Sequence, residues 1–325
     1  MLLLTERDVR AVLPMPDLIA AMEQALAAYS SGHVVQPVRS VLELGPERNF
    51  FGVMPAAIDE PAALGAKLVT VYHGNHRRGL PSHLACIALQ DPASGEMIAL
   101  MDGRYITEAR TAAVSAVSVK YMALPDARVL AIIGSGVQAR SHLEAIRHVR
   151  TLSEVRVWSP SAMHREKFAL EMTTPLLPVF PEESAADAVH RAEIVVLATA
   201  ASTPVIESAD INPGTHIAAV GACRADQREM PSDLVARARV VVDSRAGARK
   251  EAGDLIIPIA EGAIRESHIA GELGEVVLEQ VAGRLGHTDV TVFKSLGMAV
   301  EDIVAARLVL RRAREARIGQ RFSFS

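Results

Sequence analysis

The sequence is poor in the residues that mark disulfide-rich, metal-binding and nucleic-acid-binding proteins. It has only two cysteines, Cys86 and Cys223, in 325 residues. They are too few for a disulfide framework and lack a metal-ligand spacing. There is no basic block and no basic stripe interleaved with aromatic residues, and the net charge is −4. We therefore predict no metal and no nucleic-acid partner, and a reducing cytoplasm is the simplest compartment.

Long apolar runs are missing as well. The apolar start at 1–4 is too short for a signal peptide, and no later run approaches the roughly 20 residues that a membrane-spanning helix needs. We expect neither secretion nor membrane insertion. Half of the residues are hydrophobic, so the chain can bury a large core. Its length predicts two domains or one elaborate domain.

The most informative feature that is present is a glycine-rich turn near the middle of the chain. An apolar run at 129–133 predicts a buried strand, and a helical pattern follows the turn. Gly134 permits the tight bend, Gly136 lets the backbone approach a pyrophosphate, and small Ala139 lets the helix pack closely on the strand. The helix N-terminus favours an anion. A plain strand-to-helix turn is the alternative. The predicted dinucleotide contacts in this turn are Gly134, Ser135, Gly136, Val137, Gln138 and Ala139.

Strands and helices alternate after this turn, with strand-like runs at 154–158, 194–199, 216–220 and 240–242. This alternation predicts a Rossmann domain, a doubly wound parallel sheet with helices on both faces. The N-terminal third instead predicts two helices and then an antiparallel sheet, because its strand-like runs are separated by turn signals.

An amphipathic helix predicted over 298–317 is expected to pack back on the N-terminal sheet. We therefore predict an α/β protein in which a discontinuous α+β domain, residues 1–122 and 293–325, surrounds a Rossmann domain of residues 123–292.

The segment after the second Rossmann strand bears on the choice of cofactor. An Asp or Glu about 20 residues beyond the glycines usually binds the ribose 2′-OH of NAD, but residues 158–165 contain no carboxylate. Ser159, Ser161 and Arg165 suit a 2′-phosphate better. We therefore predict NADPH, with NADH as a possible cofactor. The alternative is a solvated loop with a loose cofactor preference.

Three cations of the N-terminal part stand where a positive charge is locally unfavourable. Arg39 and Lys67 interrupt strand-like runs at 37–42 and 64–72. A helix is expected over 106–122 with Thr107 as its N-cap. Arg110 would then lie in the first turn, where the helix dipole disfavours a cation unless an anion binds nearby. Singly, each is more often a residue whose charged end reaches solvent. Together, they would bind a carboxylate if they converge.

Two further segments contain groups that could act at a site. His83 ends a polar loop and could donate a proton or contact a cofactor, although a lone loop histidine is more often structural. Residues 294–297 repeat the pattern of glycine before a helix, and could bring Lys294 and a helix N-terminus to the nicotinamide. A simple helix start is the alternative.

Motifs along nearly the whole chain resemble the ornithine cyclodeaminase/mu-crystallin family, most closely its mu-crystallin branch. The matching segments are 36–40, 52–55, 67–70, 81–83, 101–103, 106–107, 110–116, 134–139, 220–229, 242–244 and 291–302.

This resemblance implies a cytoplasmic homodimer built through the discontinuous domain, with a cleft between that domain and the Rossmann domain. It implies that Arg39, Lys67 and Arg110 bind a substrate carboxylate. It also implies a set of cofactor contacts. These are Ser82, His83, Thr199, Val220, Lys294, Ser295 and Gly297.

One residue departs from the cyclodeaminase pattern. Cyclodeaminases have an Asp where this chain has Cys223, and a thiol with an ordinary pKa near 8.5 does not replace an ionised carboxylate as a base at neutral pH. The resemblance therefore favours an NAD(P)H-dependent ketimine reductase, with Cys223 in the substrate pocket. His83 or Lys67 is expected to handle the proton, and Arg110→Ala is expected to impair turnover with little change in fold.

Three other functions stay open from the sequence: an amino-acid dehydrogenase similar to the family's alanine dehydrogenases, an ornithine cyclodeaminase, and a non-catalytic binder of small ligands. Mu-crystallins resemble both a lens structural protein and a thyroid-hormone-binding protein. The three cations and the glycine loop together favour catalysis over binding alone.

Overall fold

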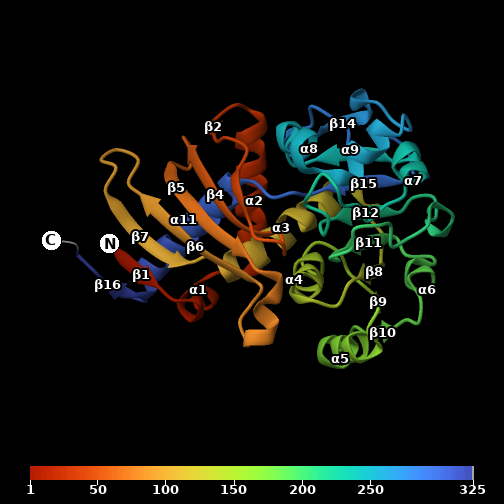
Figure 1. The fold of residues 1–325 in the computed structure, drawn as a ribbon, viewed down its shortest axis with the longest axis horizontal. Helices are drawn as coiled ribbons and strands as arrows, with labels where there is room; N and C mark the ends of the chain where they lie inside the picture. The colour runs from red at the N-terminus through yellow and green to blue at the C-terminus, as the bar shows by residue number, and fades with distance from the viewer. Residues whose placement is uncertain (324–325) are drawn as a thin grey trace. The chain divides into compact units, whose positions relative to one another are not determined.

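The computed structural model describes residues 1–323. The chain forms two compact units, Met1–Arg110 with Gly297–Ser325, and Thr111–Leu296 (Figure 1). The boundary expected after residue 122 coincides with the end of helix α3 (Arg104–Met122), and the boundary expected after residue 292 falls inside strand β15 (Thr291–Lys294). The two units are instead divided within α3, after Arg110, and beyond β15, after Leu296.

The first unit is built on a mixed sheet in the order β16-β1-β7-β6-β5-β4-β2, with β3 also paired to β4. Neighbouring strands are antiparallel except β1 and β7, which are parallel. The sequence predicts the main antiparallel strands but not β1, because three apolar residues show no periodicity. The strands are β1 (Leu2–Leu4), β2 (Val34–Val35), β3 (Ser40–Leu44), β4 (Asn49–Ile58), β5 (Ala63–Val71), β6 (His83–Gln90), β7 (Met97–Asp102) and β16 (Gln320–Arg321).

Three helices accompany this sheet: α1 (Glu6–Val12), α2 (Met15–Ser30) and α11 (Ala299–Ala316). Thr5 and Asp8 form a capping box at the start of α1. Helix α11 packs against α2 and against β4, β5 and β6, as the amphipathic pattern predicts (Figure 1). The 3-10 helix η1 (His73–Arg78) lies between β5 and β6.

The second unit contains a parallel sheet in the order β10-β9-β8-β11-β12-β15-β13-β14. The strand order reverses at β8, between β9 and β11, where nucleotides bind in doubly wound folds. This confirms the predicted Rossmann architecture, except that β15 is an interior strand of this sheet. The short edge strands β10 and β14 are not predicted from the sequence. The strands are β8 (Val129–Ile133), β9 (Glu154–Trp158), β10 (Val179–Pro181), β11 (Ile194–Leu197), β12 (His216–Ala219), β13 (Arg239–Val242) and β14 (Ile269–Glu272).

Both faces of the parallel sheet are buried. Along β8, Leu130 and Ile132 belong to one apolar cluster, and Ala131 and Ile133 belong to another. Continuous apolar runs such as 129–133 are typical of strands that helices cover on both sides. The helices are α4 (Val137–Ile146), α5 (Ala162–Met172), α6 (Ala185–Val189), α7 (Ser232–Arg237), α8 (Arg245–Glu251), α9 (Gly253–Ala260), α10 (Leu273–Val277), η2 (Ser208–Asp210) and η3 (Glu266–His268).

Two fully buried histidines of this unit hydrogen-bond to one end of α3. His142 Nε2 lies 2.9 Å from Ser115 Oγ, and His216 Nε2 lies 3.0 Å from Ser118 Oγ. Burial lowers the pKa of His142 to about 4, although its hydrogen bond to Gln138 opposes the shift. Burial, with two nearby arginines, lowers the pKa of His216 to about 3. Both imidazoles are therefore neutral in the folded protein at neutral pH.

We expect this unit to lose stability as the pH falls from 6.5 toward 4. In that window the unfolded chain binds a proton at His142 and at His216, whereas the folded chain, with both pKa values lowered, does not. Two such groups lower the free energy of unfolding by on the order of 3 kcal/mol between pH 6.5 and pH 5. Urea unfolding followed by circular dichroism at both pH values measures this loss.

The control for this prediction is His164→Gln, on the exposed side of α5. It should keep the wild-type pH dependence, whereas His142→Gln should remove about half of it. An equal loss in wild type and His142→Gln would show that His142 does not cause the acid sensitivity.

Candidate active site

The first unit contains a buried group of opposite charges around Lys67. Lys67 lies on the face of β5 that α11 covers, and its Nζ is 2.5 Å from Asp302 Oδ2. Arg110 of α3 donates from Nε to Asp302 Oδ1 at 2.9 Å and from Nη1 to Glu301 Oε2 at 2.7 Å. The side chains of Asp302 and Glu301 are completely buried. A β-strand and two helices thus hold two cations beside two carboxylates.

Arg39 and His83 lie close enough to this group to interact electrostatically with its charges. Burial lowers the pKa of Lys67 to about 8; Asp302 opposes this shift, and the positive charges of Arg110 and Arg39 add to it. Burial, together with Lys67 and Arg110, lowers the pKa of His83 to about 4. The structure therefore places Lys67 and Arg110 beside the same carboxylate, with Arg39 close enough for its charge to act on Lys67. His83 is neutral at pH 7, so it is poorly suited to donate a proton there.

Three details of these residues differ from the expectation. Helix α3 begins at Arg104, whose N–H donates to Asp102 Oδ1 at 3.0 Å, so Thr107 is not the N-cap; its Oγ1 donates to Gly103 O at 2.7 Å. Arg110 therefore lies beyond the first turn of α3. Its positive charge pairs with two carboxylates, not with an anion at the helix N-terminus. Arg39 lies immediately before β3 and not within a strand.

Glycine at position 297 makes room for Arg110. Gly297 has φ +83°, and a Cβ there would lie 2.4 Å from Arg110 Nη1. Any other residue would be strained and would displace the guanidinium. Gly297 directly precedes Met298, the N-cap of α11, whose N–H donates to Glu301 Oε2 at 3.1 Å. The segment in which the sequence predicts a glycine before a helix therefore also holds one of the carboxylates that pair with Lys67 and Arg110.

In the second unit, the glycine turn has the form of a pyrophosphate site. Gly134 has φ +117°, and a Cβ there would lie 2.4 Å from Ala198 O. A Cβ on Gly136 would meet only open space, and no side chain of the described residues caps the N-terminus of α4 that starts at Val137. Free N–H groups beside an open glycine fit a dinucleotide phosphate. Ala139 is fully buried against the sheet, as predicted.

Two other predicted cofactor contacts have buried oxygens that lack a partner. Gln138 Oε1 and Ser295 Oγ make no hydrogen bond within residues 1–323. A buried polar atom without a partner is costly, and a ligand with hydroxyl groups would satisfy it. The residues present thus fit the predicted group.

The predicted 2′-phosphate residues form one hydrogen-bonded loop. Ser159 Oγ accepts from Ser135 Oγ at 2.9 Å, and Arg165 Nη1 donates to Ser159 O at 3.2 Å. Ser161 is the N-cap of α5. Hydrogen bonds therefore connect the glycine turn to this loop and fix Arg165 against the loop backbone.

The remaining predicted contacts lie at the carboxyl ends of neighbouring parallel strands. Thr199 follows β11, Val220 follows β12, and Lys294 ends β15. Lys294 is completely buried, and its Nζ is 2.9 Å from Asp254 Oδ2. Cys223 is half-buried near them, and its Sγ donates to Val220 O at 3.4 Å. Ser82 and His83 belong to the first unit, where Ser82 O accepts from Tyr72 N at 2.8 Å.

The sequence does not predict the carboxylates that lie beside the cations of each unit. These are Glu301 and Asp302 in the first unit, and Glu229 and Asp254 in the second. The only available signal was an acidic residue three positions after a helix start, as in a capping box, which predicts a surface role. Acidic side chains are rarely buried unless they are paired, and their partners here are distant in sequence.

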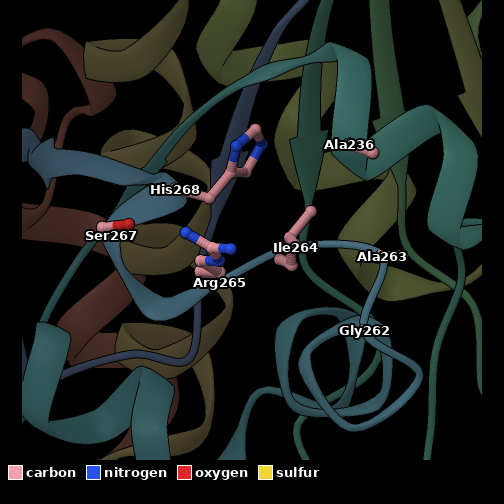
Figure 2. Close-up of a pocket in the computed structure, with 7 residues that line it drawn as sticks. All are labelled: Ala236, Gly262, Ala263, Ile264, Arg265, Ser267 and His268. Atoms are coloured by element: carbon pink, nitrogen blue, oxygen red, sulfur yellow. The ribbon is translucent and has the colours of Figure 1, made fainter.

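The surface hollow of about 390 Å³ lined by η3 is a poor candidate (Figure 2). It precedes β14, at the amino end of that strand, whereas parallel sheets bind ligands at the carboxyl ends. Its His268 Nε2 hydrogen-bonds Val235 O at 2.8 Å. Among the described residues, no group of three His, Cys, Asp or Glu side chains could hold a metal ion, and no described helix is long and apolar enough to cross a membrane.

Comparison with known proteins shows which protein family the chain resembles. The sequence model of the ornithine cyclodeaminase/mu-crystallin family matches residues 1–317. Ketimine reductase mu-crystallin of Rattus norvegicus is 43% identical over 295 residues, covering 90% of each chain. Δ1-Pyrroline-2-carboxylate reductase of Bacillus cereus is 36% identical over 326 residues, covering 100% of each chain.

A solved structure shows the same fold. Thermococcus litoralis Δ1-pyrroline-2-carboxylate reductase, in complex with NADH and L-proline, superposes with a TM-score of 0.96 and 39% identity, covering 99% of this chain and 100% of that one. The predicted enzyme class, an oxidoreductase, is confirmed by these relatives. With its interrupted mixed-sheet unit, its glycine turn and a family match along nearly its whole length, the chain belongs to the ornithine cyclodeaminase/mu-crystallin family.

Proposed function

We propose that the protein reduces cyclic ketimine 2-carboxylates, such as Δ1-pyrroline-2-carboxylate and Δ1-piperideine-2-carboxylate, to the cyclic amino acids with NAD(P)H. The observation that carries this proposal is the pair of buried cations Lys67 and Arg110, together with half-buried Arg39, whose charge acts on Lys67. The relatives named above reduce ketimines or Δ1-pyrroline-2-carboxylate. The unit Thr111–Leu296 would hold the cofactor, and the other unit would bind the substrate.

The residue types of this group fit a substrate with a carboxylate. Lys67 and Arg110 contact the carboxylates of Glu301 and Asp302, and the positive charge of Arg39 acts on Lys67. Arginine presents paired N–H donors that match a carboxylate. A fixed carboxylate orients the adjacent C=N bond, which lowers the entropic cost of reaction. The nicotinamide supplies the hydride when it is bound.

Lys67 is the better of the two predicted proton-handling groups. Its pKa of about 8 keeps it protonated at neutral pH while allowing it to give up a proton, whereas His83, with a pKa of about 4, has no proton to donate from an imidazolium. A general acid works best when its pKa lies near the working pH. Lys67 would thus protonate the ring nitrogen as hydride reaches the adjacent carbon.

The direct test is the loss of NAD(P)H absorbance with each cyclic imine, compared with pyruvate plus ammonia or methylamine. Turnover of the imines supports the proposal. Turnover of pyruvate with ammonia alone would instead indicate an amino-acid dehydrogenase. Conversion of ornithine to proline with catalytic NAD would contradict the argument drawn from Cys223. Tight ligand binding without any turnover would indicate a non-catalytic binder.

We also propose NADPH as the preferred cofactor, because the loop after β9 has no carboxylate and holds Arg165 near Ser159. Replacing Arg165 by alanine should lower the kcat/KM ratio for NADPH over NADH by about 10- to 100-fold, since a charge-assisted hydrogen bond contributes roughly 1.5–3 kcal/mol. Lys167→Ala, which removes a positive charge from the exposed side of the same helix, should leave the ratio unchanged. An unchanged ratio in Arg165→Ala would show that Arg165 does not bind the 2′-phosphate of NADPH.

A homodimer formed through the mixed sheet is a further part of the proposal. Strand register places Leu42, Leu68 and Leu84 on the sheet face opposite Lys67. They are 62%, 39% and 41% exposed. Phe51 and Val53 belong to the same face. Contiguous apolar side chains on an open sheet face are typical of a protein interface.

Leu68→Lys is expected to convert the dimer to a monomer, because a lysine there would bury an unpaired charge. Sedimentation velocity would show the change in mass. The matched control is Leu170→Lys on α5, since Leu170 is 83% exposed and lies in the other unit. A wild-type protein that sediments as a monomer would refute the interface.

A further inference from the structure

A buried carboxylate outside the chemistry described above joins two loops at the carboxyl edge of the parallel sheet. Glu229 Oε1 accepts hydrogen bonds from Thr199 N at 2.8 Å and Thr199 Oγ1 at 2.7 Å. Its Oε2 accepts from Gly221 N at 2.7 Å and Ala222 N at 3.2 Å. Thr199 follows β11, and Gly221 and Ala222 follow β12. One side chain therefore fixes the ends of two adjacent strands.

The geometry fits the ionised form of Glu229. Burial and the nearby charge of Asp254 raise the pKa of this carboxyl, while the charge of Lys294 and the hydrogen bonds from Thr199 oppose the shift. Three of the four partners are backbone N–H groups, which can only donate. A proton on Oε2 would have to displace one of its two N–H donors, and the buried donor left behind would lose its partner.

The chain accommodates this carboxylate through a glycine. A Cβ on Gly221 would lie 2.1 Å from Thr199 O and 2.4 Å from Glu229 Oε1. No other residue allows the two loops to approach the carboxylate so closely.

Asp254 and Lys294 complete a charged triad with Glu229. Asp254 Oδ1 accepts from Glu229 N at 2.7 Å, and Asp254 Oδ2 lies 2.9 Å from Lys294 Nζ. All three residues are completely buried. Two carboxylates and one ammonium leave one negative charge at this edge of the sheet.

We infer that the triad Glu229, Asp254 and Lys294 positions the loops around the nicotinamide and, by its net negative charge, favours the oxidised cofactor over the reduced one. This inference rests on the proposed function, in which the cofactor binds outside the carboxyl ends of these strands. A nicotinamide bound there would carry a positive charge on its ring in the oxidised form. A fixed negative charge in a water-poor site stabilises that charge. Glu229 is thus a positioning residue that also assists hydride release.

The test measures binding rather than turnover. Oxidised and reduced forms of the dinucleotide that the wild type binds, NADP⁺/NADPH or NAD⁺/NADH, are titrated separately by calorimetry and by cofactor fluorescence. In Asp254→Asn, which keeps the Oδ1 acceptor but removes a charge, the ratio of the oxidised to the reduced dissociation constant should rise about tenfold. This estimate takes a unit charge about 10 Å away at an effective dielectric constant of about 20. It equals a rise of about 30 mV in the potential of the bound couple.

Glu229→Gln should shift the ratio in the same direction and weaken both forms, because its amide nitrogen must face N–H donors. If Glu229→Gln does not fold, the ratio of dissociation constants in Asp254→Asn tests the inference by itself. Asp289→Asn is the control, since Asp289 also accepts two backbone hydrogen bonds but lies before β15, at its amino end. A ratio within twofold of wild type in Asp254→Asn would overturn the inference. Failure of the wild type to bind either dinucleotide would overturn the proposed function itself.

Discussion

Replacing Lys67 by methionine is expected to lower kcat for cyclic imine reduction by roughly two to four orders of magnitude. This is the usual contribution of a positioned proton donor. Lys67 is the one buried cation of its group whose pKa, about 8, lies near physiological pH. Methionine has a similar length and no charge, so Asp302 keeps Arg110 as its partner. Steady-state kinetics with each imine measures the loss.

Lys67→Arg separates proton donation from carboxylate binding. Arginine keeps the positive charge, so KM should change little, but its guanidinium does not release a proton at the working pH and kcat should still fall. The pH profile provides a second readout. Wild-type kcat should decrease as the pH rises through about 8, where Lys67 loses its proton, and Lys67→Arg should lack this decrease. A kcat within tenfold of wild type in Lys67→Met would remove Lys67 from the chemistry.

Arg110→Ala is expected to destabilise its unit as well as to impair turnover. The substitution leaves Glu301 without the Nη1 donor at 2.7 Å and Asp302 with Lys67 alone. Removing one partner of a buried ion pair costs about 3–5 kcal/mol. This replaces the expectation from sequence that the fold would hardly change. Equilibrium unfolding in urea gives the difference directly.

Arg104→Ala provides the control on the same helix. Arg104 pairs with Glu6 and Glu108 at a partly exposed position, where an ion pair contributes about 1 kcal/mol or less. Adding Glu301→Gln to Arg110→Ala should restore part of the lost stability, because it removes an uncompensated buried charge. Unfolding of Arg110→Ala at the wild-type urea concentration would mean that Glu301 and Asp302 are satisfied without Arg110.

The sequence predicts most of the nucleotide unit because its signals are local. An apolar run, a Gly134-x-Gly136 turn and a helical pattern are contiguous, and both β8 and β9 have the predicted bounds. The cation group is different. Arg110 and Glu301 are separated by 191 positions, and no periodicity connects them. Their residue types indicated a carboxylate ligand, but not that α11 already supplies two internal carboxylates.

The predicted start of helix α3 is wrong because a side chain earlier in the sequence caps the helix. Thr107 has the residue type of an N-cap, yet Asp102 accepts the N–H of Arg104 and starts the helix earlier. A shift of this size is enough to invalidate a dipole argument for Arg110, although Arg110 does lie in a buried group of charges with Glu301 and Asp302. The location of a residue within a helix turn is thus a weaker inference from sequence than the chemistry of its side chain.

The position of β15 has a consequence for the order in which the chain can fold during synthesis. This strand is formed by residues 291–294, yet it lies between β12 and β13. On a ribosome, β13 and β14 are therefore made before the strand that joins them to the rest of their sheet. Helix α11, which covers the sheet of the other unit, is made later still. Neither unit can be completed until nearly the whole chain has emerged, so the usual N-terminal-first folding of domains does not apply to this protein.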